Sequence, residues 1–307
     1  MITIIGAGKV GTSAAAFMMV KELDDILLID IIPNKPQGEA LDLSHAASIL
    51  GKSITITGSN DYKDMAGSDI VVVTAGFPRK PGMTREQLLG KNAGIIADIA
   101  EKIKEYAPNS IVLLTTNPLD AMTYVMYKKL GFPRERVIGF SGVLDAGRLA
   151  YYASRKLKIS PASIVPIVLG MHGQAMFPVP RLSTVMGAPL TSLLSPEEIE
   201  EIRKETVAAG KTITELRGYS SNYGPGAGLA VMVEAIKKNQ HKAFIASAYL
   251  KGEYGFSDIV LEVPLVLGAS GIERIIELPL NEEEKKGLAE SAEAVKKLID
   301  ALPPEYK

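Results

Sequence analysis

Short aliphatic runs alternate with longer segments of helical spacing through the first half of this 307-residue chain. The aliphatic runs show little polar alternation, as strands do when both faces of a sheet are covered; they lie at residues 2–5, 26–30, 53–57, 69–76, 110–116 and 136–141. Helical spacing marks residues 11–22, 36–50, 85–106 and 119–130 between them. Regular alternation of strand and helix is typical of an α/β fold with a parallel, doubly wound sheet. We predict that architecture for the first half of the chain.

The first predicted strand is followed by the glycine-rich segment "GAGKVG" at residues 6–11. Gly6 permits a tight turn, Gly8 lets a pyrophosphate approach the backbone, and Gly11 lets the following helix pack closely on the strand. Asp30 closes the second strand 19 residues after Gly11, where a dinucleotide-binding fold has an acidic residue for the ribose hydroxyls. Because Asp30 would repel a 2′-phosphate, we predict NAD rather than NADP. The segment "DIIPN" that begins at Asp30 contains no basic residue that bears on this choice.

The pattern changes after about residue 141, where strand-rich and helical segments no longer alternate regularly. Two helices there have capping-box signals: Ser195 with Glu198, and Asn281 with Glu284, each an N-cap residue with a glutamate three residues later. We therefore predict a dinucleotide-binding domain over residues 1–141 and an α+β substrate-binding and catalytic domain over residues 142–307.

The composition excludes several classes of protein. Lys and Arg total 34 against 35 Asp and Glu, without a long block of either sign, so neither nucleic acid nor a membrane surface is expected as a partner. No apolar run reaches the length of a membrane span. The first residues, "MITIIGAG", show no signal peptide, which favours a cytoplasmic location. Cysteine is absent, so disulfides and thiolate chemistry are excluded, and tryptophan is absent as well. The scarcity of Asn and Gln beside Glu and Lys favours a thermostable protein.

A basic loop, "GFPRKPGMTREQL" at residues 76–88, follows one strand of the predicted sheet. It contains Arg79, Lys80 and Arg85 among prolines and glycines. A solvated charged loop is one interpretation. Ligands of open α/β sheets bind beyond the carboxyl ends of the strands, so the loop's position favours a mobile segment that brings guanidinium groups to an anionic substrate.

Polar residues in three further segments suggest a proton-transfer site. Asn117, in "TTNPLD", follows another strand, although an Asn-Pro turn is a structural alternative. Asp145 and Arg148 lie three residues apart at the beginning of a predicted helix, and His172 lies between glycines in "GMHGQAM". An ion pair and a structural histidine would explain these residues separately. Together they supply an acid to orient an imidazole, a base to take a proton, and a guanidinium to hold a carboxylate. We expect His45 and His241 to be structural or surface residues.

In this order, "GAGKVG", "VVVTAGFPRKPGMTREQLL", "TTNPLD", "SGVLDAGRLAYYASRKL" and "GMHGQAM" resemble the lactate/malate dehydrogenase family along nearly the whole chain. The resemblance implies that His172 is the catalytic base and Asp145 its orienting carboxylate. It further implies that Arg148 binds the substrate's C1 carboxylate and that Arg85 polarises the reacting carbonyl. Asn117 would contact the substrate oxygen and the nicotinamide side. The cofactor contacts that it implies are Gly6, Gly8, Gly11, Asp30, Asn92, Thr115 and Asn117.

Arg79 resembles the malate-specific branch of that family, since the lactate-specific members have a neutral amide in this loop. A second substrate carboxylate in a desolvated site needs a countercharge, which a bidentate guanidinium supplies. The resemblance therefore implies reversible, NAD-dependent oxidation of (S)-malate to oxaloacetate within the tricarboxylic acid cycle. It also implies a homotetramer, with a dimer as the alternative.

Other interpretations are a lactate or other 2-hydroxyacid dehydrogenase and, more remotely, a non-catalytic NAD-binding sensor. No metal site is predicted, because the sequence contains no clustered carboxylate or histidine ligand set. Ser220 and Ser221 lie in "GYSSNYGPGAGLA", where the family completes its substrate pocket, and either could face the ligand.

Overall fold

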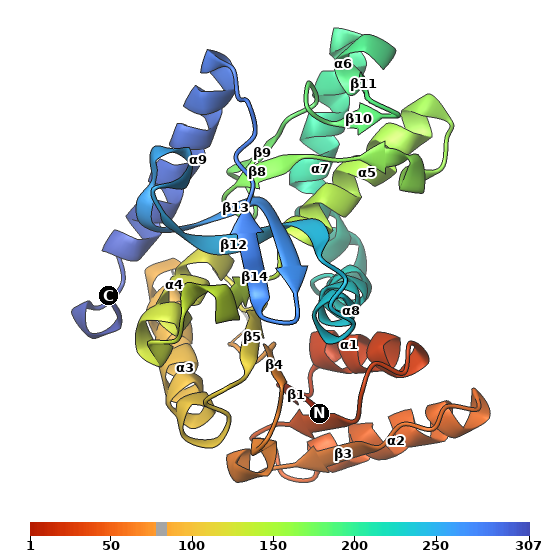
Figure 1. Cartoon of the computed structure of the whole chain (residues 1–307), viewed down its shortest axis with the longest axis vertical. Coiled ribbons are helices and arrows are strands. Elements are labelled where there is room, and N and C mark those ends of the chain that lie inside the picture. The colour runs from red at the N-terminus through yellow and green to blue at the C-terminus, as the bar shows by residue number, and fades with distance from the viewer. Residues whose placement is uncertain (78–84) are drawn as a thin grey trace.

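A computed structural model describes residues 1–77 and 85–307, with the side chain of Arg85 outside the described part (Figure 1). Six parallel strands form the first half of the molecule in the order β3-β2-β1-β4-β5-β6. They are β1 (Ile2–Ile5), β2 (Ile26–Ile29), β3 (Ile56–Ser59), β4 (Ile70–Val73), β5 (Ile111–Leu114) and β6 (Val137–Gly139). The helices between them are α1 (Lys9–Val20), α2 (Lys35–Ile49), α3 (Arg85–Tyr106) and α4 (Leu119–Leu130). The predicted doubly wound parallel sheet is confirmed.

The third strand begins later than the sequence predicts. We expected a strand over residues 53–57, but β3 spans Ile56–Ser59. The main-chain nitrogen of Ser53 donates to the Glu22 carboxylate at 3.2 Å, and that of Thr55 donates to Asp25 Oδ1 at 2.9 Å. These backbone groups bond to side chains rather than to β2, and the ladder starts only after them.

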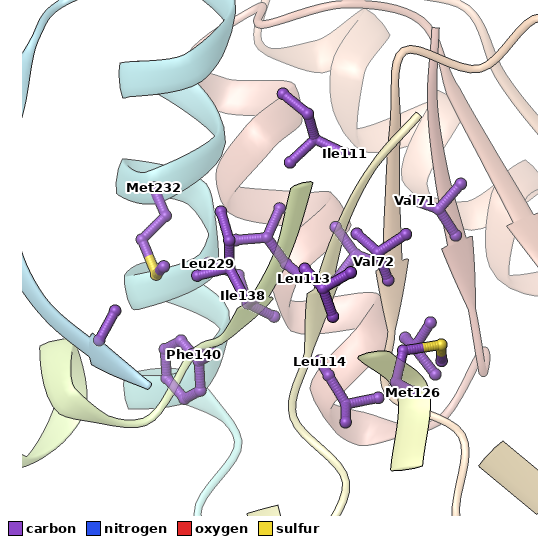
Figure 2. Close-up of a cluster of buried hydrophobic side chains, with 14 of the residues drawn as sticks. Val71, Val72, Ile111, Leu113, Leu114, Met126, Ile138, Phe140, Leu229 and Met232 are labelled. Atoms are coloured by element: carbon purple, nitrogen blue, oxygen red, sulfur yellow. The ribbon is translucent and has the colours of Figure 1, made fainter. Parts of the chain in front are cut away.

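Aliphatic strands covered by helices form the hydrophobic core, as Figure 2 shows. All four residues of β1, β2, β4 and β5 are buried. In Figure 2, Leu229 and Met232 of α8 (Tyr223–Lys237) lie among side chains of β4, β5 and β6. Helix α1 packs against α8 and α2, while α3 packs against α4 (Figure 1). The second half of the chain thus supplies α8 to cover the sheet of the first half.

The second half is an α+β arrangement, as predicted. Its helices are α5 (Gly142–Leu157), α6 (Leu190–Leu193), α7 (Pro196–Arg217), α8 and α9 (Glu282–Asp300). Its strands are β7 (Ile164–Val165), β8 (Val168–Gly170), β9 (Met176–Pro178), β10 (Thr184–Val185), β11 (Ala188–Pro189), β12 (Lys242–Lys251), β13 (Ser257–Gly268) and β14 (Gly271–Ile275). Both predicted capping boxes are present, at the beginnings of α7 and α9.

Single-turn 3₁₀ helices occur along the whole chain. They are η1 (Tyr62–Met65), η2 (Arg134–Arg136), η3 (Pro161–Ser163), η4 (Glu253–Gly255) and η5 (Pro304–Tyr306). Among the described helices, none has both the length and the apolar character needed to cross a membrane.

The two halves join where β6 meets β12. Gly139 of β6 pairs antiparallel with Ser247 of β12, and β13, β8 and β9 continue the sheet beyond β12. A Cβ atom at Gly139 would lie 2.6 Å from Ser247 Cβ, so a larger residue would push the strands apart. The boundary predicted between residues 141 and 142 falls just after β6 and remains a prediction.

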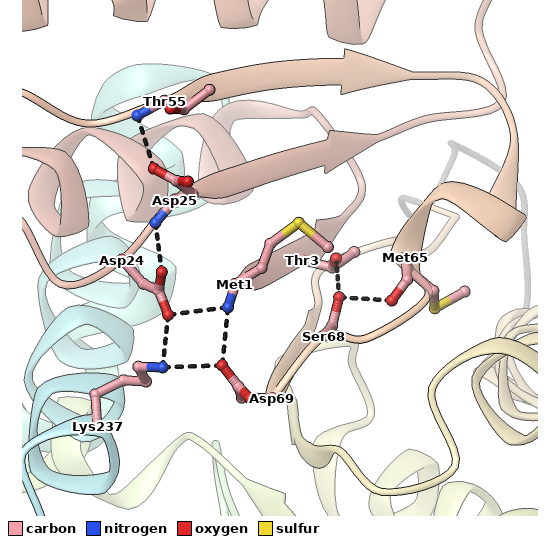
Figure 3. Close-up of polar contacts among 9 residues, drawn as sticks. All are labelled: Met1, Thr3, Asp24, Asp25, Thr55, Met65, Ser68, Asp69 and Lys237. Carbon is pink, nitrogen blue, oxygen red and sulfur yellow. Dashed lines mark hydrogen bonds and ion pairs between the residues drawn. The ribbon is translucent and has the colours of Figure 1, made fainter.

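A cluster of charges ties α8 to the amino end of the parallel sheet (Figure 3). Lys237 Nζ lies 2.5 Å from an oxygen of Asp24 and 2.9 Å from one of Asp69, and the Met1 nitrogen bonds to both carboxylates at 2.9 and 2.8 Å. Burial alone would raise the pKa of Asp24, but the bonds from Lys237 and Met1 lower it to about 2. Because this value lies below the ordinary 3.8, the stabilisation is present above pH 4 and is lost as the pH falls toward 2.

We predict that Lys237→Met lowers the free energy of unfolding by about 1 kcal/mol at pH 7, because both carboxylates lose a cation. Urea unfolding should show this loss, and the difference from the wild-type chain should shrink in 1 M NaCl, where charges are screened within about 3 Å. Lys238→Met is the matched control, since Lys238, the residue that follows α8, pairs with Glu234 of that helix. Equal losses for both variants would contradict a special role for Lys237.

Candidate active site

Most of the predicted substrate residues line one cavity of about 320 Å³ at the junction of the two halves. Its walls come from the segment after β5, from α5, from the turn after β8, and from α7 and the loop before α8. The predicted residues on its surface are Thr115, Asn117, Arg148, His172, Ser220 and Ser221. The fold thus brings together side chains from sequence segments more than 100 residues apart.

The centre of this site is a hydrogen-bonded set of His172, Asp145 and Arg148. The Nδ1 atom of His172 lies 2.6 Å from Asp145 Oδ2, and Arg148 Nη1 donates to Asp145 Oδ1 at 2.8 Å. Asp145 is fully buried, whereas the side chains of His172 and Arg148 are 16% and 12% exposed and reach the cavity. Since Nδ1 faces Asp145, the other ring nitrogen, Nε2, is the one available for proton exchange in the cavity.

The backbone around His172 is fixed on both sides. The main-chain nitrogen of His172 donates to Asp120 Oδ2 at 2.8 Å, and that of Met171 donates to Ser291 Oγ of α9 at 2.7 Å. Gly170 has φ of +93°, and a Cβ there would lie 2.2 Å from Ser291 Oγ. Gly173 has φ of +103°. The flanking glycines are therefore required by backbone conformation and by the close approach of α9.

Electrostatics favour the protonated imidazole. Burial alone would lower the pKa of His172, but the charge of Asp145 and its hydrogen bond outweigh that effect, with Glu262 adding to it, and hold the pKa well above 6.5. Burial raises the pKa of Asp120 to about 6, against the bonds that it accepts from Ser247 and the His172 backbone. Compared with these, His45 and His241 are exposed, as expected for residues outside the site.

Sequence reasoning missed Glu262, a fully buried carboxyl of β13 behind the imidazole. Its Oε1 atom lies 3.6 Å from His172 Nδ1 and accepts a hydrogen bond from Ser141 Oγ. Only its isolated position in the apolar run "DIVLEVPLVLG" could have marked it. Asp145, His172 and Glu262 place oxygen and nitrogen atoms within 4.8 Å of one another. Because Nδ1 is engaged by Asp145 and Arg148 already balances that carboxylate, this set serves the imidazole better than a metal ion.

The glycine loop and Asp30 border a second cavity of about 550 Å³ at the carboxyl ends of β1, β2 and β4. Gly6 has φ of +106°, and a Cβ at Gly11 would lie 2.0 Å from the Gly6 oxygen, whereas a Cβ at Gly8 would meet nothing within 4 Å. Helix α1 has no side-chain cap and no acidic residue in its first turn, so its free N–H groups suit a pyrophosphate. These features fit a dinucleotide.

Asp30 is held for ligand binding by backbone donors. Its carboxylate accepts hydrogen bonds from the nitrogens of Ala7 at 2.9 Å and Ile32 at 3.0 Å. Lys35 Nζ lies 3.3 Å from the same carboxylate and also borders the cavity. The segment "DIIPN" contains no basic residue, but the next residue, Lys35, places a cation beside Asp30.

Asn92, Thr115 and Asn117 are the other predicted cofactor contacts, and Thr115 and Asn117 line the substrate cavity. Asn92 is buried, accepts a hydrogen bond from the Phe77 nitrogen at 2.7 Å and donates to the Asn117 oxygen at 2.7 Å. This geometry makes Asn92 a support for the two loops, and its cofactor contact remains a prediction. Thr115 Oγ1 donates to the Val73 oxygen at 3.3 Å. The Asn117–Pro118 peptide bond is cis, and Asn117 lines the substrate cavity.

The last predicted residues are the two serines before α8 and the cations of the basic loop. Ser220 and Ser221 both line the cavity, Ser220 exposed and Ser221 half-buried. Arg79 and Lys80 lie outside the described residues, as does the side chain of Arg85, which is the first residue of α3.

Both halves match one known family. Residues 1–139 match the description "lactate/malate dehydrogenase, NAD binding domain", and residues 142–303 match "lactate/malate dehydrogenase, alpha/beta C-terminal domain". The chain belongs to the lactate/malate dehydrogenase family. Its family membership indicates NAD as the cofactor.

Similar members of the family include malate dehydrogenases of Aeropyrum pernix, 66% identical over all of both chains, and of Pyrobaculum aerophilum, 63% identical over 100% of this chain and 99% of the relative. The solved malate dehydrogenase from Aeropyrum pernix has a TM-score of 0.97 and covers 100% of this chain and 99% of its own. A lactate dehydrogenase from Eimeria maxima, solved with NADH and oxamate, has a TM-score of 0.94 at 36% identity, over 98% of this chain and 93% of its own. The fold alone therefore does not distinguish the two activities.

The two glycines Gly8 and Gly11 are expected to have different roles, one in cofactor binding and one in folding stability. Gly11→Ala should lower the free energy of unfolding by about 1–3 kcal/mol, because its Cβ would overlap the Gly6 carbonyl. Gly8 has extended backbone angles that any residue adopts, so Gly8→Ala should stay within about 0.5 kcal/mol of the wild-type stability. It should weaken NADH binding roughly tenfold, since a methyl group would face the pyrophosphate.

Urea unfolding and a titration of NADH fluorescence check these two expectations, and the absence of tryptophan keeps the protein background low. If Gly8→Ala destabilises the chain as much as Gly11→Ala, or binds NADH unchanged, the assignment of the pyrophosphate position is wrong.

Proposed function

We propose that this chain is a malate dehydrogenase, which oxidises (S)-malate to oxaloacetate with NAD and catalyses the reverse reduction with NADH. One observation carries the proposal: a buried carboxylate, Asp145, bonds to both an imidazole and a guanidinium on the wall of one cavity. This is the arrangement that a 2-hydroxyacid needs, with a base for the hydroxyl proton and a cation for the adjacent carboxylate. Its close relatives named malate dehydrogenase support the choice of substrate.

In this mechanism Arg148 binds the C1 carboxylate of malate through the guanidinium N–H groups that do not face Asp145. His172 Nε2 then takes the C2 hydroxyl proton, and Asp145 stabilises the imidazolium through Nδ1. The hydride of C2 would pass to the nicotinamide when NAD is bound, which is the chemistry that the cofactor supplies. The products are oxaloacetate, NADH and one proton, which His172 releases to solvent. The glycine loop, Asp30 and the N-terminus of α1 are the residues that would hold the cofactor.

Arg79 and Arg85 complete the proposed substrate contacts. We assign Arg79 to the C4 carboxylate and Arg85 to the C2 oxygen, with Asn117 beside that oxygen. A substrate such as pyruvate would leave Arg79 without a partner, and an unpaired charge in a desolvated site is costly. This charge argument, together with the relatives' names, favours malate over lactate.

The homotetramer, the cytoplasmic location, the place in the tricarboxylic acid cycle and the thermostability stay predictions. Of these, sedimentation equilibrium at several concentrations distinguishes a tetramer from the alternative dimer. Thermal unfolding followed by circular dichroism tests the stability.

The raised pKa of His172 gives the two directions opposite pH dependences. Reduction of oxaloacetate requires protonated His172, so its kcat/KM should be highest below the histidine's pKa and fall as the pH rises through it. Oxidation of malate requires the neutral imidazole and should increase over the same interval. Initial rates in both directions between pH 6 and pH 11 check this; two flat alkaline profiles would contradict His172 as the base.

The decisive experiment compares kcat/KM for oxaloacetate and pyruvate with NADH. We expect the wild-type chain to prefer oxaloacetate on the order of 10⁴-fold, because pyruvate leaves a polar partner unpaired. Arg79→Gln should reduce that preference by lowering the value for oxaloacetate. Lys80→Gln, which removes a charge from the next residue, is the matched control and should leave the preference unchanged.

Three other outcomes would contradict parts of the proposal. Equal turnover of pyruvate and oxaloacetate by the wild-type chain would favour a broader 2-hydroxyacid dehydrogenase. A preference that is insensitive to Arg79→Gln would remove Arg79 as the discriminating residue. If the wild-type chain turns over no 2-oxoacid, the non-catalytic NAD-binding sensor becomes the favoured interpretation.

A further inference from the structure

Glu262 is a charged residue type at a position where strands normally have an apolar side chain. It lies in the middle of β13, is fully buried, and its main chain pairs with Gly170 of β8, two residues before His172. Residues on both sides of it, from Ile259 to Leu267, are buried as well. A buried carboxyl without a compensating role would be costly. Its position beside the catalytic histidine suggests what that role is.

Within the described residues, the side chain of Glu262 makes its polar contacts with Ser141 and His172. Oε1 accepts a hydrogen bond from Ser141 Oγ and lies 3.6 Å from His172 Nδ1, while Oε2 has no hydrogen-bond partner in the described part of the chain. Ser141 precedes α5 at its N-cap position, yet its hydroxyl makes no cap hydrogen bond. The serine therefore holds the carboxyl instead of capping the helix that carries Asp145.

The charged groups around Glu262 are few and come from known elements. Asp145 comes from α5, where Arg148 bonds to it, Asp120 comes from α4, and His172 comes from the turn after β8. The buried face of α8 is apolar, and β14 pairs with Leu265–Gly268, away from Glu262. On α9 the buried carboxylate, Glu284, bonds to Arg181; β12 contributes the hydroxyl of Ser247. His172 is thus the one titratable cation in direct reach of Glu262 among the described residues.

We propose that Glu262 is a positioning residue for His172, a second buried carboxyl which, held by Ser141, shares the Nδ1 side of the imidazole with Asp145 and keeps the imidazolium form at higher pH. The inference rests on the proposed function, since it concerns the proton that His172 exchanges with the substrate. It assigns Glu262 no contact with substrate or cofactor. Its effect passes through the charge that it presents to the ring.

Glu262 is expected to stabilise the imidazolium of His172 only at alkaline pH. Burial, with the negative charge of Asp145 adding to it, raises the pKa of Glu262 to about 8. At neutral pH the carboxyl is therefore protonated and uncharged, and Asp145 alone stabilises the imidazolium. As the pH rises above 8, Glu262 loses its proton, and its negative charge near Nδ1 opposes deprotonation of His172. The second carboxyl therefore widens the pH range over which His172 can donate a proton to oxaloacetate.

Glu262→Gln tests the inference, because glutamine keeps the shape and the acceptor for Ser141 but cannot ionise. We predict that the wild-type chain and the variant have pH profiles of kcat/KM for oxaloacetate reduction with the same form below pH 7. Above that, the alkaline limb of the variant should fall about 1 pH unit earlier, the lower end of the effect expected from a neighbouring charge. Glu273→Gln is the matched control, since Glu273 bonds to the surface histidine His241 at 2.8 Å and should not move the limb.

A second readout does not depend on activity. The chain has three histidines, so the ring signals of ¹³Cε1-labelled histidine can be assigned with His172→Asn and titrated by NMR in the protein without substrate. The His172 signal should titrate about 1 pH unit lower in Glu262→Gln than in the wild-type chain. Ser141→Ala should shift it in the same direction, because loss of the hydroxyl donor disfavours the ionised carboxylate.

The outcomes separate the inference from the proposed function. A uniform loss of rate in Glu262→Gln, with the alkaline limb and the His172 titration unmoved, would show a merely structural role and overturn the inference. Failure of the wild-type chain to reduce oxaloacetate would remove the proposed function, and the NMR titration would then decide the Glu262–His172 coupling alone.

Discussion

The close approach of Gly139 and Ser247 is the constraint on which the site depends. Because residue 139 has no side chain, β12 can pair with the last parallel strand, and the sheet continues from the NAD-binding half into β12 and β13. That continuity places two segments on the same cavity: α5, which begins three residues after Gly139, and the turn after β8. Ser247 itself donates to Asp120, which in turn holds the His172 backbone. One residue contact therefore joins the two halves of the sheet and supports the catalytic turn.

Three carboxyl groups surround a single imidazole, and their different partners give them different tasks. Asp120 binds the backbone of His172, Asp145 binds the ring, and Glu262 lies 3.6 Å from the same ring nitrogen as Asp145. Burial favours the neutral form of each acid, whereas hydrogen-bond donors favour the ionised form. Asp120 accepts hydrogen bonds from two uncharged donors, the Ser247 hydroxyl and the His172 backbone, whereas Asp145 bonds to a guanidinium and an imidazole. Glu262 accepts one hydrogen bond, from Ser141. The same chemical group therefore serves as an anchor for the backbone, as an orienting charge for the ring, and as a second carboxyl beside the ring.

Much of this architecture could be predicted from local sequence. The aliphatic runs, the glycine loop with Asp30, and both capping boxes depend on residues close together in the chain, and the structure contains them. Residue types alone suggested that Asp145 orients the imidazole of His172, but 27 residues separate the two, and the specific roles of base and orienting carboxylate came from the family resemblance. Glu262 could not be predicted, because it lies in an ordinary apolar strand 90 residues after His172 and is functional only through its neighbours across the sheet. Lys35, whose ammonium lies 3.3 Å from Asp30, was missed because it directly follows the segment "DIIPN" that was considered.

The shared carboxylate of Asp145 has a consequence for how such an enzyme can diverge. The same side chain accepts from Arg148 and from His172, so the anchor for one end of the substrate and the acid–base group are not independent parts. A substitution that repositions the anchor also alters the environment of the base, and a lineage cannot change one without retuning the other. New substrates are more accessible through changes elsewhere in the pocket, where the contacted portion of the molecule takes no part in proton transfer. Related enzymes are therefore expected to keep the recognition of the hydroxyl carbon and its neighbouring carboxylate, and to differ in which group they bind at the opposite end of the substrate.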